Sequence, residues 1–477
     1  MEELTQFAVD FAGSLKAEYA EARFQSDVKE VVILKNGFTE ALAFQESKGI
    51  SVRVVAGNSL GFASASRLTK KAVRSAVRQA VKLARAASKI PGKGVSMSEC
   101  DLGKANVKVK PVIKFADVDL ETRVQLLKEV DQCAQESAAK VKVKMPARML
   151  NFTTWITEKN VVTSDGARVH SVTPRVALSS LLTALHPQSG IVQRSFNLGG
   201  TGGWEVVKEW NMFELFAEEA SSLSRILLEA KKAPKGVVDL VLGPEVIGLV
   251  SHESSGHPGE ADRILGREAA QAGETYLKPD SLGLRVGSSH VNVVDDPTVK
   301  GSFGYYEYDD EGVKARKRTL IKEGVINEFL HNRETASVFR VTSNGASRAV
   351  AYNREPIVRM ANTFLEPGDY TKEELFEGVK DGVYIKNFME WNIDDRRFNQ
   401  RYVGLEAYRI KNGELSEMVK NPVLEVTTIG LWSAVDAVGK DLEFQAAYCG
   451  KGDPMQGIPV WTGGPHVRLR KIRLGGA

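Results

Sequence analysis

The chain has 477 residues, which is long enough for two or three domains with sizeable hydrophobic cores. Its 43% apolar and 26% charged residues are typical of a soluble globular protein, and a formal net charge of +4 is too small to indicate a nucleic-acid partner. The sequence has no run of about 18 apolar residues. It begins with the acidic Met1-Glu2-Glu3, so we expect neither a membrane span nor a secretion signal.

The N-terminal stretch predicts a helix followed by an antiparallel meander. Glu2 to Lys16 carries four apolar side chains on one helical face: Leu4, Phe7, Phe11 and Leu15. Alternating polarity then predicts five strands, at 19–25, 31–35, 39–45, 50–56 and 60–65. Three glycine-containing pairs are expected to form turns between them: Asn36-Gly37, Lys48-Gly49 and Gly57-Asn58.

Arg67 to Lys89 predicts a helix with a basic stripe. The stripe consists of Lys70, Arg74, Arg78, Lys82, Arg85 and Lys89. A nucleic-acid or membrane surface is one interpretation of it. A solvated face over a packed sheet is favoured, because no aromatic residues alternate with the basic ones to stack on bases.

The next segments alternate between loops, helices and strands. Residues 90–112 are rich in Pro, Gly and Lys and predict a surface loop, and helices are expected at 119–139 and 212–230. Residues 149–193 predict strands with a hairpin at Asp165-Gly166. The glycine-dense stretch from Asn197 to Trp204 does not fit a dinucleotide-binding fingerprint, and we expect a flexible loop that could act as a lid.

Lys231 to Gly236 is short, basic and contains Pro and Gly, so we place a domain boundary there, with domains at 1–235 and 236–477. The second domain predicts a strand at 237–242, a helix carrying the motif described below, and a segment beside it at 268–278. Further strands are expected at 291–295, 319–322, 325–330, 357–363, 383–389, 401–411, 422–429 and 467–474. A helix at 431–438 interrupts them. We therefore predict an α+β fold of two domains, each with a curved, mainly antiparallel sheet and packed helices.

A loop at Gly301 to Lys314 concentrates tyrosines and acids: Tyr305, Tyr306, Glu307, Tyr308, Asp309, Asp310 and Glu311. Such a loop is either a solvated turn or a cleft wall that contacts substrate.

Two of the seven histidines lie five residues apart, at His252 and His257, after the apolar run from Val237 to Val250. On a regular helix this spacing separates side chains by about 140°, too far for one metal ion, whereas a spacing of four gives about 40°. Gly256 and Pro258 offer a remedy. Gly256 is permissive, and Pro258 should push His257 out of the α region, so the helix should end or widen near Gly256; a one-turn π-bulge would have the same effect.

Catalytic zinc takes three protein ligands and leaves a position for water. With two histidines in place, the candidates for the third ligand are Cys449, Glu260 and Asp262, and Cys449 is preferred because its glycine neighbours let the backbone come close. Glu253, next to a ligand, is the candidate general base. The three cysteines, Cys100, Cys133 and Cys449, are too few for a disulfide framework and favour a reducing, cytoplasmic compartment.

His252-Glu253-x-x-x-His257, with Glu260 beyond it, resembles the active-site helix of TldD proteins in the TldD/PmbA family. The resemblance extends through segments along the whole chain: Gly49 to Val54, Val293 to Asp296, Gly301-Ser302, Asp309 to Gly312, Ile321 to Gly324 and Cys449 to Gly452. Two features depart from it. Ser254 and Ser255 replace more apolar residues, and Asp453-Pro454-Met455 replaces a shorter glycine-rich continuation.

The resemblance implies a zinc metallopeptidase that acts on peptides or unfolded polypeptides. It assigns His252, His257 and Cys449 as the Zn²⁺ ligands and Glu253 as the general base. It also implies a two-domain α+β protomer that dimerises around an enclosed cavity. TldD-like subunits keep the motif and PmbA (TldE)-like subunits lose it, so this chain resembles the catalytic kind, paired with itself or with a motif-less paralogue.

Two other functions stay open at this point. In one, Cys449 is a nucleophile served by a histidine without metal, although Glu253 would then have no clear task. In the other, the protein is a non-enzymatic binding or regulatory protein, and a zinc ion with four protein ligands only stabilises the fold of the second domain.

Overall fold

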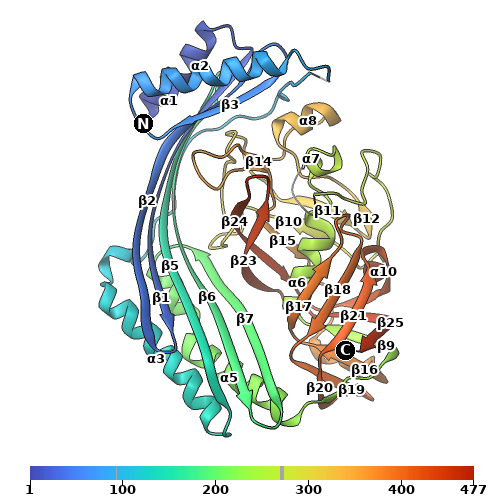
Figure 1. The fold of residues 1–477 in the computed structure, drawn as a ribbon. Helices are drawn as coiled ribbons and strands as arrows, with labels where there is room; N and C mark the ends of the chain where they lie inside the picture. The colour runs from blue at the N-terminus through green and yellow to red at the C-terminus, as the bar shows by residue number, and fades with distance from the viewer. Residues whose placement is uncertain (93, 269–272, 477) are drawn as a thin grey trace.

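The computed structural model describes residues 1–92, 94–268 and 273–476. Its N-terminal part is a seven-stranded sheet in the order β3-β2-β1-β5-β6-β4, with β7 also paired to β6. The strands are β1 Tyr19–Lys35, β2 Phe38–Val55, β3 Leu60–Ala65, β4 Lys104–Lys108, β5 Lys144–Thr163, β6 Arg168–His186 and β7 Gly190–Thr201. The long strands arch around the C-terminal part of the chain (Figure 1).

Several predicted boundaries in this sheet are wrong. The strands expected at 19–25 and 31–35 form one strand, β1, and Lys48-Gly49 lies inside β2 instead of forming a turn. Gly49 is required for a close approach, because a Cβ there would lie 2.3 Å from the ring of Tyr352. The loop expected at 90–112 contains β4, which runs parallel to β6.

The glycine-dense stretch is not a flexible loop. Residues up to Thr201 belong to β7 and pair with β6 as far as Arg175. Gly199 faces Phe303 and Ala446, and a Cβ at Gly203 would lie 2.0 Å from the carbonyl oxygen of Ile113. Gly199 therefore allows tight packing between the two parts of the chain, Gly203 allows it within the N-terminal part, and no lid is present in this stretch.

Helices pack against the sheet near its two ends (Figure 1). They are α1 Glu2–Ser14, α2 Lys70–Ala87, η1 Phe115–Asp117, α3 Leu120–Ala139, α4 Trp204–Glu209 and α5 Met212–Glu229. Of these, α1 and α2 lie at one end of the sheet, and α3 and α5 lie at the other. On the basic face of α2, the guanidinium of Arg74 stacks on Phe7 and Phe11 of α1, and that of Arg78 stacks on Phe11. These cation–π contacts engage part of the stripe with α1. The apolar side of α2 is buried against β2 and β3, which agrees with the interpretation of the stripe as a solvated face over a packed sheet.

The described residues of the C-terminal part form three sheets. Ten strands follow the order β17-β18-β21-β25-β9-β16-β19-β20-β8 with β22 beside β25, six follow β12-β11-β10-β15-β24-β23, and β13 pairs with β14. The strands are β8 Lys231–Lys232, β9 Gly236–Leu242, β10 Val293–Asp295, β11 Arg318–Lys322, β12 Val325–Ile326, β13 Ser347–Arg348, β14 Ile357–Val358, β15 Asn362–Leu365, β16 Asp381–Ile385, β17 Phe388–Ile393, β18 Asn399–Gly404, β19 Ala407–Lys411, β20 Glu414–Lys420, β21 Pro422–Thr427, β22 Val435–Val438, β23 Glu443–Lys451, β24 Gln456–Gly464 and β25 Val467–Gly476.

Short helices join these sheets: α6 Pro244–Ser251, the π-helix η2 His252–Gly256, α7 Ala261–Ile264, α8 Arg333–Phe339, α9 Lys372–Glu377 and α10 Thr428–Ala434. The predicted α+β class is confirmed. The helix expected at 431–438 is wrong in its second half, which forms β22. The domain boundary after residue 235 stays a prediction. No helix among the described residues is long and apolar enough to cross a membrane.

The Gly301–Lys314 loop is not simply a solvated turn. Glu307 is exposed, but the other three acids, Asp309, Asp310 and Glu311, are buried at the junction of the two parts. Asp310 pairs with Lys159 at 2.7 Å and with Arg23 at 3.4 Å, and Glu311 pairs with Arg53. These ion pairs join the loop to β1, β2 and β5 of the N-terminal sheet.

Candidate metal centre

The motif lies at the end of α6, a buried helix that begins with Pro244 at its first position. Its last turn widens into η2, where the backbone N–H of His257 donates to the carbonyl of His252 across 3.1 Å. This bond spans five residues, so it places the two imidazoles one turn apart, with ring centroids separated by 4.9 Å. The predicted widening of the helix is confirmed in its π-turn form.

Pro258 does not push His257 out of the α region, so this part of the prediction is wrong. His257 keeps helical dihedral angles, φ −58° and ψ −45°. The wide turn itself brings the rings together, and the local preference before proline is overridden by the five-residue hydrogen bond and burial. Gly256 serves close packing here, because a Cβ at this position would lie 1.9 Å from the sulfur of Met360.

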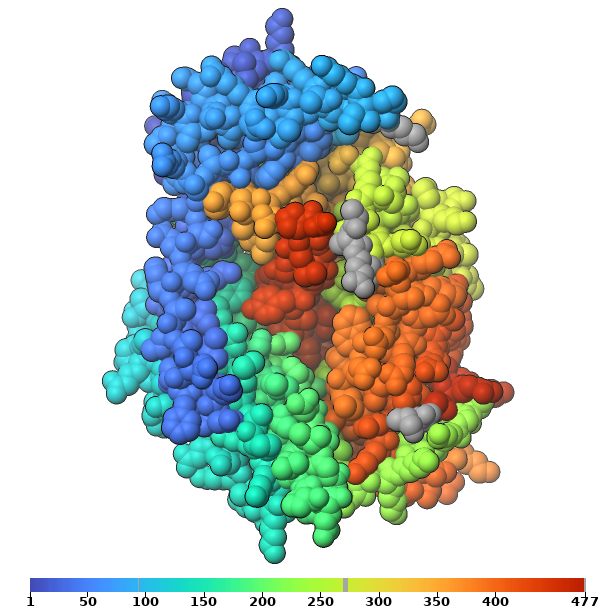
Figure 2. Space-filling view, in the orientation of Figure 1, coloured from blue at the N-terminus to red at the C-terminus, as the bar shows by residue number. Residues whose placement is uncertain are grey.

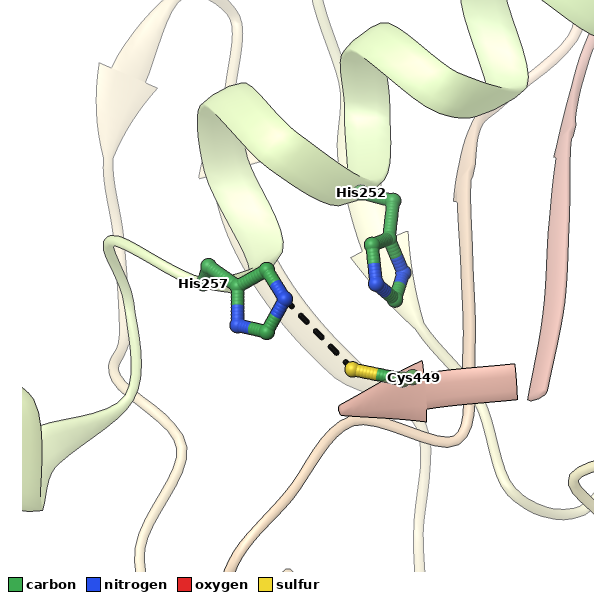
Figure 3. A group of neighbouring side chains, drawn as sticks. All are labelled: His252, His257 and Cys449. Atoms are coloured by element: carbon green, nitrogen blue, oxygen red, sulfur yellow. Dashed lines mark hydrogen bonds between the residues drawn. The ribbon is translucent and has the colours of Figure 1, made fainter. Parts of the chain in front are cut away.

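Cys449 reaches the same point from β23, 192 residues after His257. Ligand atoms of His252, His257 and Cys449 all lie within 4.8 Å of one another, and all three residues are buried. Figure 3 shows both imidazoles directed from the helix toward the strand, with the Cys449 sulfur 3.4 Å from Nε2 of His257. The guanidinium of Arg359 donates to the backbone carbonyl of Cys449 and fixes the strand.

Glu260 and Asp262, the alternative third ligands, lie behind this group. Nδ1 of His257 contacts the Glu260 carboxylate at 2.9 Å, which leaves Nε2 facing Cys449. Burial raises the pKa of Glu260, but the charges of Lys451 and His257 outweigh it and hold this pKa well below its usual range. Asp262 accepts a hydrogen bond from Lys451 at 2.7 Å. Glu260 is therefore placed to orient His257, as carboxylates commonly orient metal-binding imidazoles.

The donor set fits a metal ion such as zinc, which favours nitrogen and sulfur ligands and needs neutral imidazoles and a thiolate. Burial lowers the pKa values of His252 and His257. Burial would raise the pKa of Cys449, yet His257 and Arg359 lower it to about 7. Among the described residues, none hydrogen-bonds the buried Nδ1 of His252.

A cavity of about 530 Å³ opens on these three residues and Glu253. It is walled by residues of β7, α6, β17 and β23: Ser195, Phe196, Asn197, Glu245, Leu249, Phe388, Met389, Trp391, and 445–450. In the space-filling view the C-terminal hairpin of β23 and β24 lies recessed between the N-terminal sheet and the neighbouring C-terminal strands (Figure 2). His252, His257 and Cys449 therefore stand in the wall of a space that could hold a substrate.

Arg397 is a cavity residue that the sequence did not single out. It lies in the turn between β17 and β18 with φ +60°, and it forms an ion pair with Oε2 of Glu253. No motif surrounds it, so no sequence signal was available. Lys451 belongs to the segment from Cys449 to Gly452, which is part of the family resemblance. Its ion pairs with Glu260 and Asp262 become visible only in the folded structure.

The segment expected beside the site is described only in part, since 269–272 lie outside the described residues. The hydroxyl of Thr275 donates to the carbonyl of Pro258 at 3.1 Å, which places the end of this segment next to the motif.

Comparison with known proteins shows which family the chain belongs to. Residues 235–476 match the PmbA/TldA metallopeptidase C-terminal domain, 113–228 match the central domain of the same family, and 20–84 match its first domain. A metalloprotease of Methanocaldococcus jannaschii is 32% identical over 94% of this chain and 96% of its own length. A zinc metalloprotease TldD homolog of Saccharolobus solfataricus is 31% identical over 56% of this chain and 58% of its own.

The fold is also that of a solved structure. The crystal structure of TldE from Thermococcus kodakarensis superposes with a TM-score of 0.74 at 16% identity, covering 100% of both chains. The three matched domains and the relatives named metalloproteases together show that the chain is a metalloprotease of the PmbA/TldD family.

Proposed function

We propose that the chain is a zinc-dependent peptidase that hydrolyses peptides or unfolded polypeptides, with Glu253 as the general base. The observation that carries this proposal is the convergence of His252, His257 and Cys449 within 4.8 Å in the wall of the cavity. Glu253 follows the first of these residues directly and lines the same cavity. This combination supplies what hydrolysis with an open metal site requires.

Zinc held by His252, His257 and Cys449 would polarise the scissile carbonyl and make water a better nucleophile. Glu253 takes a proton from the attacking water and later passes it to the leaving amine. The guanidinium of Arg397 holds the Glu253 carboxylate in the cavity. Glu260 holds the ring of His257 so that Nε2 faces the other two ligands.

An extended peptide suits the shape of the site. β23 is the last strand of the six-stranded sheet, β7 lies at an edge of the N-terminal sheet, and both line the cavity. A peptide laid against a strand edge is recognised through its backbone and tolerates many side chains. The apolar Phe196, Phe388 and Trp391 would contact its side chains. Unfolded segments fit this requirement better than folded proteins.

We also propose that the protein works in the cytoplasm as a dimer, with an identical chain or with a motif-less TldE-like paralogue. The chain keeps every ligand candidate, and its fold is shared with a protein named TldE. In a pair of this kind, this chain supplies the catalytic centre.

One observation favours a second candidate, a cysteine hydrolase. Cys449, His257 and Glu260 are connected by contacts of 3.4 Å and 2.9 Å, the order found in cysteine nucleophile sites. That reading gives His252 and Glu253 no task, so the metal site is preferred. Inhibition by a chelator, restored by zinc, distinguishes the two.

The test of the proposal is Glu253→Gln, assayed on an unfolded protein such as reduced casein. We expect activity to fall by about 10²–10⁴-fold, the usual contribution of general base catalysis, while zinc content stays at the wild-type level. Glu245→Gln is the matched control, because Glu245 lines the same cavity but pairs with Arg194, and it should keep most of the activity. A Glu253→Gln protein with zinc and full activity would remove this residue from the mechanism.

A further inference from the structure

A second cavity lies on the concave face of the N-terminal sheet, between that sheet and the C-terminal part. Alternate residues of β1, β5 and β6 face it: Gln25, Asp27, Lys29, Trp155, Thr157, Lys159, Val161, Val169, Ser171, Thr173 and Arg175. Strand pairing aligns them in rows, such as Lys29 with Trp155 and Trp155 with Arg175. An inward sheet face normally packs apolar side chains. This one presents mostly polar and charged groups.

Two buried guanidiniums project from opposite sides of this cavity. Arg175 comes from β6 and donates to the carbonyls of Phe303 and Tyr305. Arg348 comes from β13 and donates to the carbonyls of Met360 and Pro459. Each residue is 8% exposed. Within the described part of the chain, neither guanidinium has a carboxylate oxygen within the 4.0 Å of an ion pair.

Most other buried arginines have such a partner. Arg53 pairs with Glu21 and Glu311, and Arg318 pairs with Asp295. Arg348 also lies over the ring of Tyr306, 5.2 Å from its centroid. Neither an aromatic ring nor a backbone carbonyl neutralises a buried charge, so the positive charge of Arg175 and Arg348 calls for an anion. Burial and the nearby charge of Arg348 lower the pKa of Arg175 to about 9. This shift agrees with a positive charge that no nearby carboxylate fully compensates.

The carboxylates that line the cavity are engaged elsewhere. Asp310 accepts from Lys159, from Arg23 and from the backbone N–H of Ala349. Asp27 accepts from the hydroxyl of Thr157 and the amide of Gln25. Asp309 accepts from the backbone N–H groups of Glu311, Val313 and Ser347. Each acid therefore has local donors, and none of these contacts involves Arg175 or Arg348.

The space is small and separate from the cavity at the metal centre. Its volume is about 110 Å³, below the roughly 300–1,000 Å³ of sites for larger ligands. Tyr448 is shared by the two linings, and Cys449 lines only the cavity at the metal centre. A peptide would not fit here, but a compact ion would.

We propose that this cavity binds a small oxyanion, a phosphate or a carboxylate, between the guanidiniums of Arg175 and Arg348. Such an ion would accept hydrogen bonds from both arginines and would match the planar, bidentate geometry of their N–H groups. Because Arg175 belongs to the N-terminal sheet and Arg348 to the C-terminal part, the bound ion ties the two parts together. The proposal does not depend on peptidase activity.

The test is calorimetric titration of the full-length, zinc-loaded protein with inorganic phosphate, and separately with N-acetylglycine, at constant ionic strength. Saturable binding is expected for at least one of them. Phosphate alone would identify a free phosphate ligand, and N-acetylglycine alone would identify a small carboxylate. N-acetylglycinamide, which has no carboxylate, should not bind. Thermal unfolding in the same solutions should show a higher Tm with the ion that binds.

Arg175→Gln should weaken binding by at least about tenfold, since hydrogen bonds to charged groups each contribute this much or more. Arg468→Gln is the control: Arg468 is equally buried, but it pairs with Asp436 outside the cavity, and affinity should not change. If Arg175→Gln does not fold, Ser171→Leu adds bulk to the cavity lining while keeping both arginines, and it should abolish binding. Absence of binding by both ions, or unchanged binding in the folded variants, would overturn the proposal.

Discussion

At the scale of single residues, the centre depends on how His257 is held. Its Nδ1 contacts Glu260, and Glu260 is itself surrounded by Arg263 at 3.2 Å and Lys451 at 3.4 Å. All these groups are buried, so the charges act on one another through little water. The two cations keep Glu260 ionised, and the ionised carboxylate fixes the imidazole.

Glu260→Gln removes this charge while keeping the size of the side chain. We expect zinc affinity to fall by about 10–100-fold, the usual effect of changing a residue that orients a metal ligand. Competition with a fluorescent zinc chelator measures it. Glu328→Gln, which removes a carboxylate paired with Arg316 at the surface, is the control and should leave the affinity at the wild-type value. Equal affinities for the two variants would show that Glu260 does not orient the centre.

His331 predicts how stability depends on pH. Burial lowers the pKa of His331 to about 4, from about 6.5 in the unfolded chain. Below about pH 6.5, His331 is protonated in the unfolded chain but stays neutral in the folded protein. The part of the stability that depends on His331 therefore falls as the pH decreases from about 6.5 toward 4, and it does not change above about pH 6.5. The contribution of this residue is on the order of 3 kcal/mol.

In His331→Phe this part of the pH dependence should disappear, because phenylalanine does not titrate. The variant should fold, since the imidazole of His331 lies beside the rings of Phe329 and Phe339 and its site accepts an apolar side chain. Urea unfolding at pH 4.5 and 7.5 measures the difference. The partly exposed His186 provides the comparison, and His186→Phe should keep the wild-type slope. A slope in His331→Phe as steep as that of the wild type would contradict the assignment.

At the scale of elements, helices and most strands followed from periodicity, but strand lengths did not. Residues 38–48 of β2 are largely exposed on both faces, so no buried face shows that the strand predicted at 39–45 continues into the one predicted at 50–56. Inward positions of β1 carry Gln25 and Asp27 because they face the polar cavity. Glycines were misread for a related reason: Gly49 and Gly199 serve close packing, and composition alone does not distinguish this from a turn.

The π-turn of η2 is the element on which the site depends, and Gly256 makes it possible. In Gly256→Ala the new Cβ would lie 1.9 Å from the Met360 sulfur, so the turn or Met360 must move. We expect a loss of about 1–3 kcal/mol in stability, as for overpacked cores, together with lower zinc occupancy. Metal analysis and urea unfolding of the same preparation measure both.

Gly13→Ala is the control for this change, since Gly13 lies in α1 with no atom within 4 Å of the added Cβ. It should stabilise the protein slightly, by about 0.5–1 kcal/mol. Met360→Ala combined with Gly256→Ala should recover zinc occupancy by removing the clash. Full occupancy in the single variant would show that the turn does not need this glycine.

At the scale of the whole molecule, the site is assembled from segments that only the tertiary fold brings together. Spacing around His252 predicted a metal site and a widened helix, but it left Cys449, Glu260 and Asp262 open as third ligands. The family resemblance selected Cys449, and the fold places its sulfur by His257 while Glu260 and Asp262 lie behind. Arg397 could not be foreseen, because its role arises from a turn that packs on Glu253.

Buried ion pairs fix the position of the N-terminal part relative to the C-terminal part around these cavities. Arg53 in β2 forms an ion pair with Glu311 of the Gly301–Lys314 loop, and Arg333 in α8 forms one with Asp165 in the turn between β5 and β6. Any other arrangement of the two parts would separate these pairs and leave buried charges without partners. The pairs therefore favour one arrangement of the two parts, although they add little net stability. The metal centre and the proposed oxyanion cavity both lie where this arrangement brings the N-terminal sheet against β23 and β24.

The central claim is that two histidines and a distant cysteine bind one zinc ion, and zinc content per chain tests it most directly. Wild type, Cys449→Ala and Cys133→Ala should be purified identically and measured by atomic emission. The account predicts about one zinc per chain in the wild type and in Cys133→Ala, and far less in Cys449→Ala. Unchanged zinc in Cys449→Ala, or none in the wild type, would contradict it.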